Sequence, residues 1–326
     1  MKIMNLSFAD SAGAAYTLAH ALNKEPNIQA INLRANNNYI DYPTISEMRY
    51  YAEEAAREMV YGSDVLVLHT AVQPFFTGLH LDKNRIKGKR VLLYFHGSDA
   101  RTYGKAIIKQ ADDLLGTGGY EVLVSTPDLL ELLPQAQWMP VARSFTETRM
   151  RYGLDNRDAR ALAAFKGGIK KTIVSHAPTS QERKGSALFY MVITEMIQAF
   201  PQVEYQVIQQ MTWDQAQRAM SRVSIFFDQH LLGAYGLAGV EASIFKAAVF
   251  CKLKPSVIEA MEKQTGQKNP FIQWDTDDEL RQQAFTLVTD KKLRDKFGQM
   301  AYDYSKAVHD EAPVAAKFLK IVEAMG

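Results

Sequence analysis

Several features that would assign a class at once are scarce in this sequence. Its 326 residues include one cysteine, Cys251, which excludes an internal disulfide framework and indicates a reducing compartment. Because Cys251 lies in the apolar run AAVFCKL, a buried structural thiol is favoured over a nucleophile. No run approaches the roughly 18 apolar residues of a membrane span, and MKIMNLSFAD lacks the pattern of a signal peptide. We therefore expect a cytoplasmic protein.

Charge of one sign and the common cofactor motifs are also lacking. The net charge is +2, so no global basic field indicates nucleic acid. The segment ADSAG is not a Gly-x-Gly-x-x-Gly fingerprint, and there is no P-loop or Gly-x-Ser-x-Gly elbow. The seven histidines have no metal-site spacing, and Asp112-Asp113 and Asp277-Asp278 are typical of a helix surface and a helix start. We expect neither a metal nor a cofactor.

What the sequence does contain is a regular alternation of strands and helices. Hydrophobic content of 47% and charged content of 23% are those of a globular protein. Short β-rich runs alternate with helical patterns, which indicates βα units and parallel sheets. The predicted strands are KIMNLSF, IQAINLR, DVLVLHT, RVLLYFH and EVLVST in the first half, and KTIVSHA, VEYQVIQ, VSIFFDQ and AAVFCKL in the second. The prediction is an α/β fold with two Rossmann-like, doubly wound domains, one after the other.

The domain boundaries follow from length and composition. A chain of this length favours two domains of about 150 residues each. Residues 143–171 are polar and charged and contain a Gly-Gly pair, which is typical of a linker. We predict an N-terminal domain over 1–145, a linker over 146–170 and a C-terminal domain over 171–305. Residues 306–326 are predicted as a terminal helix, and its return to the first domain is left open.

The strongest local signal lies in the second half. The predicted strand 223–229 is followed by the turn and helix GAYGLAGVEA, residues 233–242. The start of a helix carries unpaired N–H groups and partial positive charge, so it binds anions. Glu241 follows about one turn further on, in an apolar run that would bury it, and a buried carboxylate needs partners. An anion site with a nearby carboxylate suits a nucleoside diphosphate and its ribose. Residues 11–13 form a second turn of this kind, carried by Gly13.

Three segments of the second half resemble, in order, the C-terminal domain of GT-B glycosyltransferases of the retaining, GT4-like family (glycosyltransferase group 1). These segments are HAPTSQERKGSALF, VSIFFDQHLLGAYGLAGVEASIFKAAVF and AYDYSKAVHDEAPVAAKFLKIVE. The first half matches by strand order and by the fragment YFHGSDAR. The resemblance implies a nucleotide-sugar donor held between the domains, mostly by the second one, and transfer without a metal ion.

The resemblance also assigns roles to residues of the second half. Lys184, next to Gly185 at a helix start, would stabilise charge on the departing diphosphate, and Glu241 would accept hydrogen bonds from the ribose hydroxyls. The alternatives are a solvated lysine and an ordinary helical glutamate. The whole predicted donor side comprises Gly13, His176, Arg183, Gly185, Asp228, Gln229, Tyr235, Gly236 and Leu237. The last three would act through backbone N–H groups, although Tyr235 could serve turn packing instead.

Two positions depart from the family pattern. Gly233 stands eight positions before Glu241, where a glutamate usually holds the transferred sugar. Sugar recognition would then come from elsewhere, with Asp228 or Gln229 as candidates. His176 stands where an arginine often accompanies the lysine, and a histidine is only partly charged near neutral pH. Both changes leave open a non-catalytic member of the family.

In the first half, the end of RVLLYFHGSDAR carries the best candidates. His96 ends a strand and Gly97 permits close approach of a ligand. In the related enzymes a residue at this place lines the reacting sugar, so His96 joins Lys184 and Glu241 in the predicted catalytic set. The predicted acceptor or sugar side is Gly97, Ser98, Asp99 and Arg101. The alternatives are a histidine packed at a strand end and a structural Asp99–Arg101 pair. His69 is predicted to be core or cleft wall.

The sequence thus predicts an enzyme that moves a sugar from a nucleoside diphosphate sugar to an acceptor hydroxyl, with retention. The acceptor (glycan, lipid-linked glycan, small molecule or modified DNA base) is not specified. A DNA-modifying enzyme would need a phosphate-tracking surface, for which the candidates are Lys83, Arg85, Lys87, Lys89 and Arg90. That basic run is otherwise a solvated loop. A nucleotide-sugar epimerase and a non-catalytic nucleotide-sugar-binding protein are further alternatives.

Overall fold

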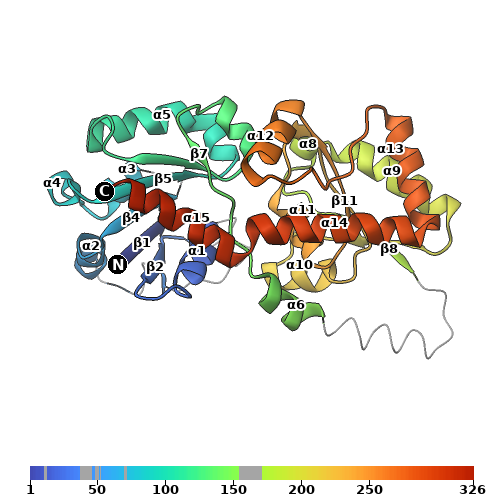
Figure 1. The fold of residues 1–326 in the computed structure, drawn as a ribbon, viewed down its shortest axis with the longest axis horizontal. Helices are drawn as coiled ribbons and strands as arrows, with labels where there is room; N and C mark the ends of the chain where they lie inside the picture. The colour runs from blue at the N-terminus through green and yellow to red at the C-terminus, as the bar shows by residue number, and fades with distance from the viewer. Residues whose placement is uncertain (11–12, 37–45, 48–50, 52, 70–71, 154–170) are drawn as a thin grey trace. The chain divides into compact units, whose positions relative to one another are not determined.

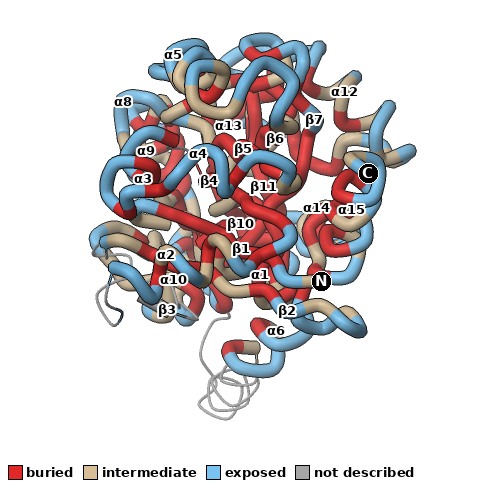
Figure 2. The backbone as a smooth tube through the Cα atoms, turned by 90° about the vertical axis from the view of Figure 1, so that its left-hand side faces the viewer, coloured by how far each residue is buried: buried red, intermediate tan, exposed pale blue. Residues whose placement is uncertain are grey.

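Two parallel β-sheets organise the chain. The computed structural model describes residues 1–10, 13–36, 46–47, 51, 53–69, 72–153 and 171–326 (Figure 1). The chain divides into two compact units, the first made of residues 1–143 and 309–326 and the second of residues 144–308. Each unit is a parallel sheet with helices, so the predicted fold class of two Rossmann-like α/β domains is confirmed. The strands are buried along most of their length, whereas many helices keep an exposed face (Figure 2).

The first unit contains a seven-stranded sheet in the order β3-β2-β1-β4-β5-β6-β7. Every adjacent pair is parallel. The strand order reverses between β1 and β4, and open α/β sheets bind ligands beyond the carboxyl ends of the strands at such a point. The strands are β1 (Lys2–Ser7), β2 (Gln29–Arg34), β3 (Ser46–Glu47), β4 (Val65–His69), β5 (Arg90–Phe95), β6 (Glu121–Val124) and β7 (Gln137–Trp138).

Helices cover this sheet, and the central strands are apolar because they are buried on both faces. The helices before the second unit are α1 (Ala14–Leu22), α2 (Glu53–Tyr61), α3 (Gln73–Gly78), α4 (Lys83–Ile86) and α5 (Ser98–Leu115), with a 3₁₀ turn over Pro127–Glu131. In α2, Ala56 and Val60 are one turn apart and both are buried.

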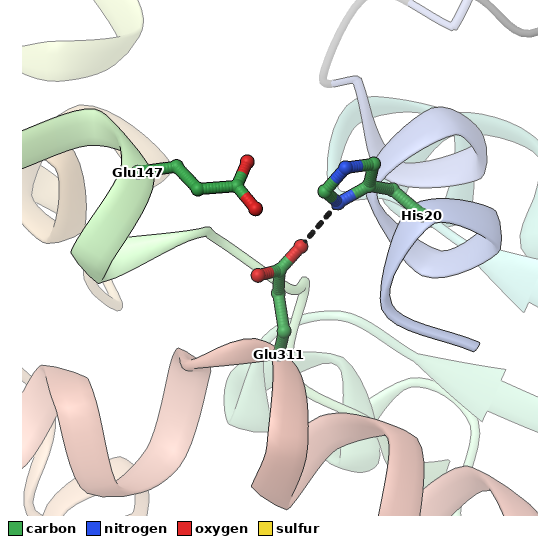
Figure 3. A group of neighbouring side chains, drawn as sticks. All are labelled: His20, Glu147 and Glu311. Atoms are coloured by element: carbon green, nitrogen blue, oxygen red, sulfur yellow. Dashed lines mark hydrogen bonds and ion pairs between the residues drawn. The ribbon is translucent and has the colours of Figure 1, made fainter. Parts of the chain in front are cut away.

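The last helix, α15 (Glu311–Ala324), belongs to the first unit and packs on α1. Val314, Phe318 and Val322 are spaced four residues apart and are all buried, which is the pattern of a helix with one apolar face. At its start the Glu311 carboxylate contacts the His20 ring (Figure 3) and lies 2.6 Å from Lys24 Nζ. The chain therefore ends on the unit in which it begins.

The second unit contains a four-stranded sheet in the order β11-β10-β8-β9, again parallel. Its strands are β8 (Thr172–His176), β9 (Val203–Val207), β10 (Ile225–Gly233) and β11 (Ala248–Leu253). Its helices are α6 (Phe145–Gly153), α8 (Gln181–Lys184), α9 (Ser186–Ala199), α10 (Trp213–Met220), α11 (Leu237–Ile244), α12 (Pro255–Thr265), α13 (Asp277–Thr289) and α14 (Lys291–His309). Phe189, Phe227 and Phe250 are fully buried in its core.

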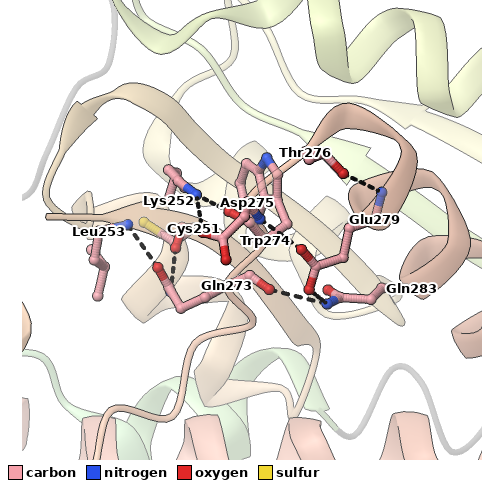
Figure 4. A network of polar contacts seen from close by, with 9 residues as sticks. All are labelled: Cys251, Lys252, Leu253, Gln273, Trp274, Asp275, Thr276, Glu279 and Gln283. Atoms are coloured by element: carbon pink, nitrogen blue, oxygen red, sulfur yellow. Dashed lines mark hydrogen bonds and ion pairs between the residues drawn. The ribbon is translucent and has the colours of Figure 1, made fainter. Parts of the chain in front are cut away.

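A side chain covers part of the outer edge of β11. The Gln273 amide accepts a hydrogen bond from the Leu253 backbone N–H (2.8 Å) and donates one to the Cys251 carbonyl (2.5 Å), so it pairs with the strand as another peptide group would (Figure 4). Lys252 contacts the Trp274 carbonyl in the same network. These bonds use edge groups that would otherwise be open to another chain.

One predicted boundary differs from the structure. Residues 145–153, predicted to lie mostly in the linker, form helix α6, and Phe145 and Tyr152 are fully buried in the second unit. The Tyr152 hydroxyl donates to the Asp214 carboxylate at 2.7 Å. The polar composition of this stretch concealed two aromatic residues seven positions apart, which share one helical face. The rest of the predicted linker, 154–170, lies outside the described residues.

Within the described ranges, none of the helices combines the length and apolar character required to span a membrane.

Candidate functional site

Asp228, the first residue of β10 beyond its pairing with β8, lies between two other predicted site residues of the second unit. The Lys184 ammonium, from the end of α8, lies 3.1 Å from Asp228 Oδ1. The backbone N–H of Gly236, at the start of α11, donates to Asp228 Oδ2 at 2.5 Å. Asp228 is fully buried and the Lys184 side chain is 11% exposed. The structure thus joins the predicted lysine and the predicted glycine turn through a carboxylate of the chain itself.

The glycines of the GAYGLAG segment leave room for side chains of the chain itself. A Cβ at Gly236 would lie 2.9 Å from Asp228 Oδ1, and one at Gly239 would lie 2.8 Å from Asp228 Oδ2. At Gly233, where φ is +71°, a Cβ would lie 2.5 Å from Lys254 Cγ. The Gly236 N–H that was predicted to bind a phosphate is hydrogen-bonded to Asp228. The start of α11 therefore binds an anionic group, and that group is the side-chain carboxylate of Asp228.

A second tight turn positions Lys184. Gly185 ends α8 and begins α9 with φ at +69°, a left-handed conformation that favours glycine. A Cβ at Gly185 would lie 3.0 Å from both His230 Cβ and Leu231 Cγ on β10. The turn therefore holds the Lys184 backbone close to β10. Arg183, one residue earlier, is exposed on α8.

Glu241 lies about one turn into α11 and is 5% exposed. Its Oε1 accepts a hydrogen bond from the Trp213 indole N–H at 3.2 Å. The predicted burial of this carboxylate is correct, and Trp213 is a partner that sequence reasoning missed. In the sequence, Thr212 and Gln215 form a capping box that marks the start of a helix. This pattern could have placed Trp213 at the first position of α10.

Three further donor-side residues are less open to a ligand. Tyr235 is buried, and its ring lies 5.2 Å from the Phe271 ring, centroid to centroid. The packing alternative therefore describes its side chain. Leu237 is half-buried at the first position of α11. Gln229 is 3% exposed and lies in the middle of β10, at a register shift between β10 and β11.

The structure places the predicted donor-side residue His176 inside the second unit. Its Nδ1 lies 2.6 Å from the Phe227 carbonyl oxygen and its Nε2 lies 2.7 Å from Ser186 Oγ. Because a carbonyl only accepts hydrogen bonds, Nδ1 carries the proton and Nε2 accepts from Ser186. Burial lowers the pKa of His176 to about 4, so the ring is neutral at physiological pH. His176 is fully buried and connects β8, β10 and α9.

The helix start after Gly13, predicted as an anion site, carries a carboxylate of the chain itself. Asp10 Oδ1 accepts from the Ala15 N–H and Asp10 Oδ2 from the Tyr16 N–H, each at 3.0 Å. A carboxylate from the end of β1 therefore occupies the N-terminus of α1, as Asp228 does for α11. Ser11 and Ala12, the other members of the predicted turn, lie outside the described residues.

In the first unit, His96 and His69 form a hydrogen-bonded pair. His96 Nε2 lies 2.9 Å from His69 Nδ1, and His69 Nε2 lies 3.1 Å from Asn5 Oδ1. Burial lowers the pKa of His96 to about 3, and it lowers the pKa of His69 well below its usual value. Both rings are therefore neutral. His69 is 2% exposed, as expected for a core residue, but it also connects β4 to the switch point at β1.

The segment after His96 turns sharply. Its arginine, Arg101, pairs with Asp128 and not with Asp99 as considered from the sequence. Gly97 has φ at +65°, and Ser98 is exposed at the start of α5. Asp99 Oδ2 accepts from the His96 backbone N–H at 3.2 Å. Arg101 donates twice to Asp128 Oδ2, at 2.5 and 3.1 Å. The structural partner of Arg101 is therefore Asp128, which sequence reasoning missed although it follows a predicted strand in EVLVSTPD.

The basic run considered for DNA is partly used within the first unit. Arg85 pairs with Glu58 at 2.9 Å and lies 3.7 Å from the centroid of the Tyr61 ring. Lys89 donates to the Tyr61 carbonyl at 2.7 Å. Two of the five candidate cations therefore have intramolecular roles.

Comparisons with known proteins give no match in sequence and extensive matches in structure. No protein-family model matches the chain, and no curated protein matches it. An α-glucosyltransferase solved with UDP and a 13-mer DNA has 12% identity and a TM-score of 0.68, covering 99% of this chain and 100% of that one. HepE from Anabaena, solved with UDP and glucose, has 11% identity and a TM-score of 0.64, covering 99% and 100%.

A UDP-GlcNAc 2-epimerase from Neisseria meningitidis, solved with UDP-GlcNAc, has 10% identity and a TM-score of 0.57 and covers all of both chains. At such identities the likeness concerns the fold. The chain has the two-domain α/β fold of the GT-B class.

Proposed function

We propose that the protein transfers a sugar from a nucleoside diphosphate sugar to an acceptor hydroxyl. The observation that carries this proposal is that Lys184 and the start of α11 both contact Asp228, just beyond the carboxyl end of β8. Glu241 lies five residues beyond Gly236 on the same helix. This is the edge of an open α/β sheet that binds ligands. The structural neighbours solved with UDP or UDP-GlcNAc support a nucleotide as the ligand.

The chemistry of glycosyl transfer assigns a role to each of these groups. Departure of the diphosphate leaves negative charge on its phosphate and positive charge on the sugar. The Lys184 ammonium has three N–H donors, one of which points to Asp228, and it would stabilise the departing phosphate together with the α11 start. Asp228 would hold the ammonium in place, and Glu241, oriented by Trp213, would bind the ribose.

Retention and metal independence are part of the proposal. The resemblance to the retaining family supports retention, and a fixed lysine with a helix N-terminus can stabilise the leaving group in place of a divalent ion. Gly233 has no side chain with which to bind the transferred sugar. The first unit, through His96 and its neighbours, would therefore supply sugar or acceptor contacts.

The test begins with a thermal-shift screen of nucleotide sugars, because a ligand that binds only the native state raises its melting temperature. With the donor found, Lys184→Ala should lower turnover by about 10²–10³-fold while nucleotide affinity changes much less. Glu182→Ala is the matched control, since Glu182 is exposed on the same helix and has no predicted role, and it should keep turnover near normal. Unchanged turnover in Lys184→Ala would count against the proposed role.

Transfer to a modified base in DNA is a second candidate, favoured by the neighbour that was solved with DNA. It predicts DNA retention that weakens steeply with salt, and absence of retention at low salt removes it. The epimerase neighbour keeps a third candidate open, which should release free nucleotide with no acceptor added. Nucleotide binding without any donor turnover would instead indicate a binding protein.

A further inference from the structure

Three of the four sheet edges in the described structure are protected against another chain, and the fourth is not. In the first unit the edge strands β3 and β7 are only two residues long, which leaves little for another strand to pair with. In the second unit the Gln273 side chain covers part of the edge of β11. The opposite edge strand, β9, has five residues, Val203–Val207, and contains neither proline nor lysine. Among the described residues, β8 is the strand that pairs with it.

The register with β8 decides which backbone groups of β9 point outward. The Thr172 N–H, on β8, donates to the Gln202 carbonyl at 2.9 Å, so Gln202 directs its backbone toward β8. In a strand the backbone groups of alternate residues point to the same side, and the even-numbered residues of β9 therefore face β8. The N–H and C=O groups of Val203, Tyr205 and Val207 consequently face away from the sheet.

Two of these outward groups already have partners within the chain. The Val203 N–H donates to the Phe200 carbonyl at 2.9 Å. The Val207 carbonyl accepts from Gln206 Nε2 at 3.2 Å. Within the described part of the chain, the groups left at the edge are two donors and two acceptors. The donors are the N–H groups of Tyr205 and Val207, and the acceptors are the carbonyls of Val203 and Tyr205.

The sequence of β9, VEYQV, complements itself when a second copy runs in the opposite direction. With a two-fold axis at Tyr205, Val203 lies opposite Val207 of the second copy, and Glu204 lies opposite Gln206. A carboxylate then faces an amide that can donate to it, and no like charges are opposed. The open backbone groups also match, because the Tyr205 N–H meets the Tyr205 carbonyl of the other copy and the Val207 N–H meets the Val203 carbonyl.

Exposed apolar side chains adjoin this edge on the side of α9. The Tyr190 ring, on α9, lies 6.2 Å from the Tyr205 ring, centroid to centroid. Side chains alternate along a strand, so Val207 lies on the same face of the sheet as Tyr205, and it is 48% exposed. Ile197 follows Tyr190 by two helical turns on the same side of α9 and is 43% exposed. Pairing of two copies would remove apolar surface from water as well as complete the ladder.

We propose that β9 is an interaction surface for a second copy of this chain, which pairs with it antiparallel about a two-fold axis at Tyr205. A two-fold contact uses the same surface on both copies, so each pair of facing residues occurs twice. The sequence and the open groups of β9 meet that requirement. The contact is separate from the proposed nucleotide site, because β8 lies between β9 and β10, the strand that carries Asp228.

Sedimentation velocity of the full chain tests the proposal, over protein concentrations from about 1 to about 100 µM. We expect a monomer–dimer equilibrium in which the dimer fraction rises with concentration. Val207→Pro removes one N–H donor from each copy at an edge position where proline is tolerated, and it should shift the equilibrium to monomer. A monomer at every concentration, or a dimer that Val207→Pro leaves unchanged, overturns the proposal.

A matched pair of lysine variants assigns the contact to β9. Val207→Lys places a charge on the edge and should also favour the monomer. Met300→Lys is the control, because Met300 is a comparably exposed apolar residue on α14 of the same unit, and it should leave the dimer intact. Equal effects of the two variants overturn the proposal. Circular dichroism verifies that each variant is folded.

A charge exchange tests the antiparallel register. Gln206→Glu places a second carboxylate opposite Glu204 at both of the symmetry-related pairs, and opposed like charges destabilise a strand pair. The dissociation constant of the dimer should therefore rise about tenfold. Adding Glu204→Lys to this variant makes each pair oppositely charged and should restore the dimer. An unchanged dimer in Gln206→Glu, or no restoration in the folded double variant, overturns the proposal.

The proposed function is tested by a separate measurement on the same proteins. Nucleotide affinity should be the same in all of these variants, since β9 carries none of the proposed donor-binding residues. Absence of nucleotide binding by the unaltered protein would defeat the proposed function, whereas the dimer contact would still stand.

Discussion

Replacing Gly236 with alanine should destabilise the second unit through one contact. The backbone at Gly236 is extended, with φ at −99° and ψ at 163°, so any residue can adopt it. The added Cβ would lie 2.9 Å from Asp228 Oδ1 and 3.5 Å from Lys184 Nζ. Asp228 is fully buried and held by two hydrogen bonds, so it has little freedom to move. Overpacking of this kind costs about 1–3 kcal/mol in the free energy of unfolding.

A double-mutant cycle separates this contact from other effects. Asp228→Ala removes the carboxylate but leaves the Lys184 charge without its partner, which costs about 3–5 kcal/mol for a buried pair. The cost should fall near the lower end because the Lys184 side chain retains 11% exposure. With the carboxylate absent, the Cβ at position 236 has room. The double variant should therefore lose less stability than the two single variants together, by a coupling energy of about 1–3 kcal/mol.

Urea unfolding followed by tryptophan fluorescence measures these differences, since Trp213 and Trp274 both lie in the second unit. Gly153→Ala is the control, because a Cβ there meets nothing closer than 4.0 Å, and it should be neutral or slightly stabilising. If Asp228→Ala yields too little folded protein, Asp228→Ser gives the same test with a smaller cavity. Additive costs, or a Gly236→Ala variant of normal stability that loses only nucleotide affinity, would refute the reasoning.

Two further predictions concern stability. Burial lowers the pKa of His176 to about 4. Between pH 6.5 and pH 4 the unfolded chain therefore takes up a proton at this residue that the native state does not. The free energy of unfolding of the second unit should fall by up to about 3 kcal/mol over that interval. His176→Gln should flatten this slope in urea midpoints measured from pH 4 to 8, and an unchanged slope would contradict the assignment. Phe318→Ala on α15 removes a fully buried ring and should cost about 3–5 kcal/mol. Hydrogen exchange should then rise in α1 and α15 but not in residues 171–308, and a uniform rise would contradict the two-unit description.

Much of the fold was predictable from local patterns. Apolar runs predicted nine of the eleven strands in the described sheets, because burial on two faces leaves a continuous apolar run in the sequence. The two-residue strands β3 and β7 are too short to leave such a run. The burial of Glu241 was predictable for the same reason, since GLAGVEASIF is apolar. Helix α6 was missed because a surface helix with two buried aromatic residues is mostly polar in composition.

The sequence by itself determined that a glycine turn and a helix follow β10, and that a Lys-Gly pair directly precedes α9. Only the tertiary structure decided what occupies that turn. Asp228 and Lys184 are 44 positions apart, and the Asp228 carboxylate accepts the Gly236 N–H. In the first unit, likewise, the sequence placed His96 at a strand end. The tautomer of the His96 ring is set through His69 by Asn5, which lies on another strand. Asn5 and His69 meet because β1 pairs with β4. Such contacts between distant residues are long-range, and no local pattern encodes them.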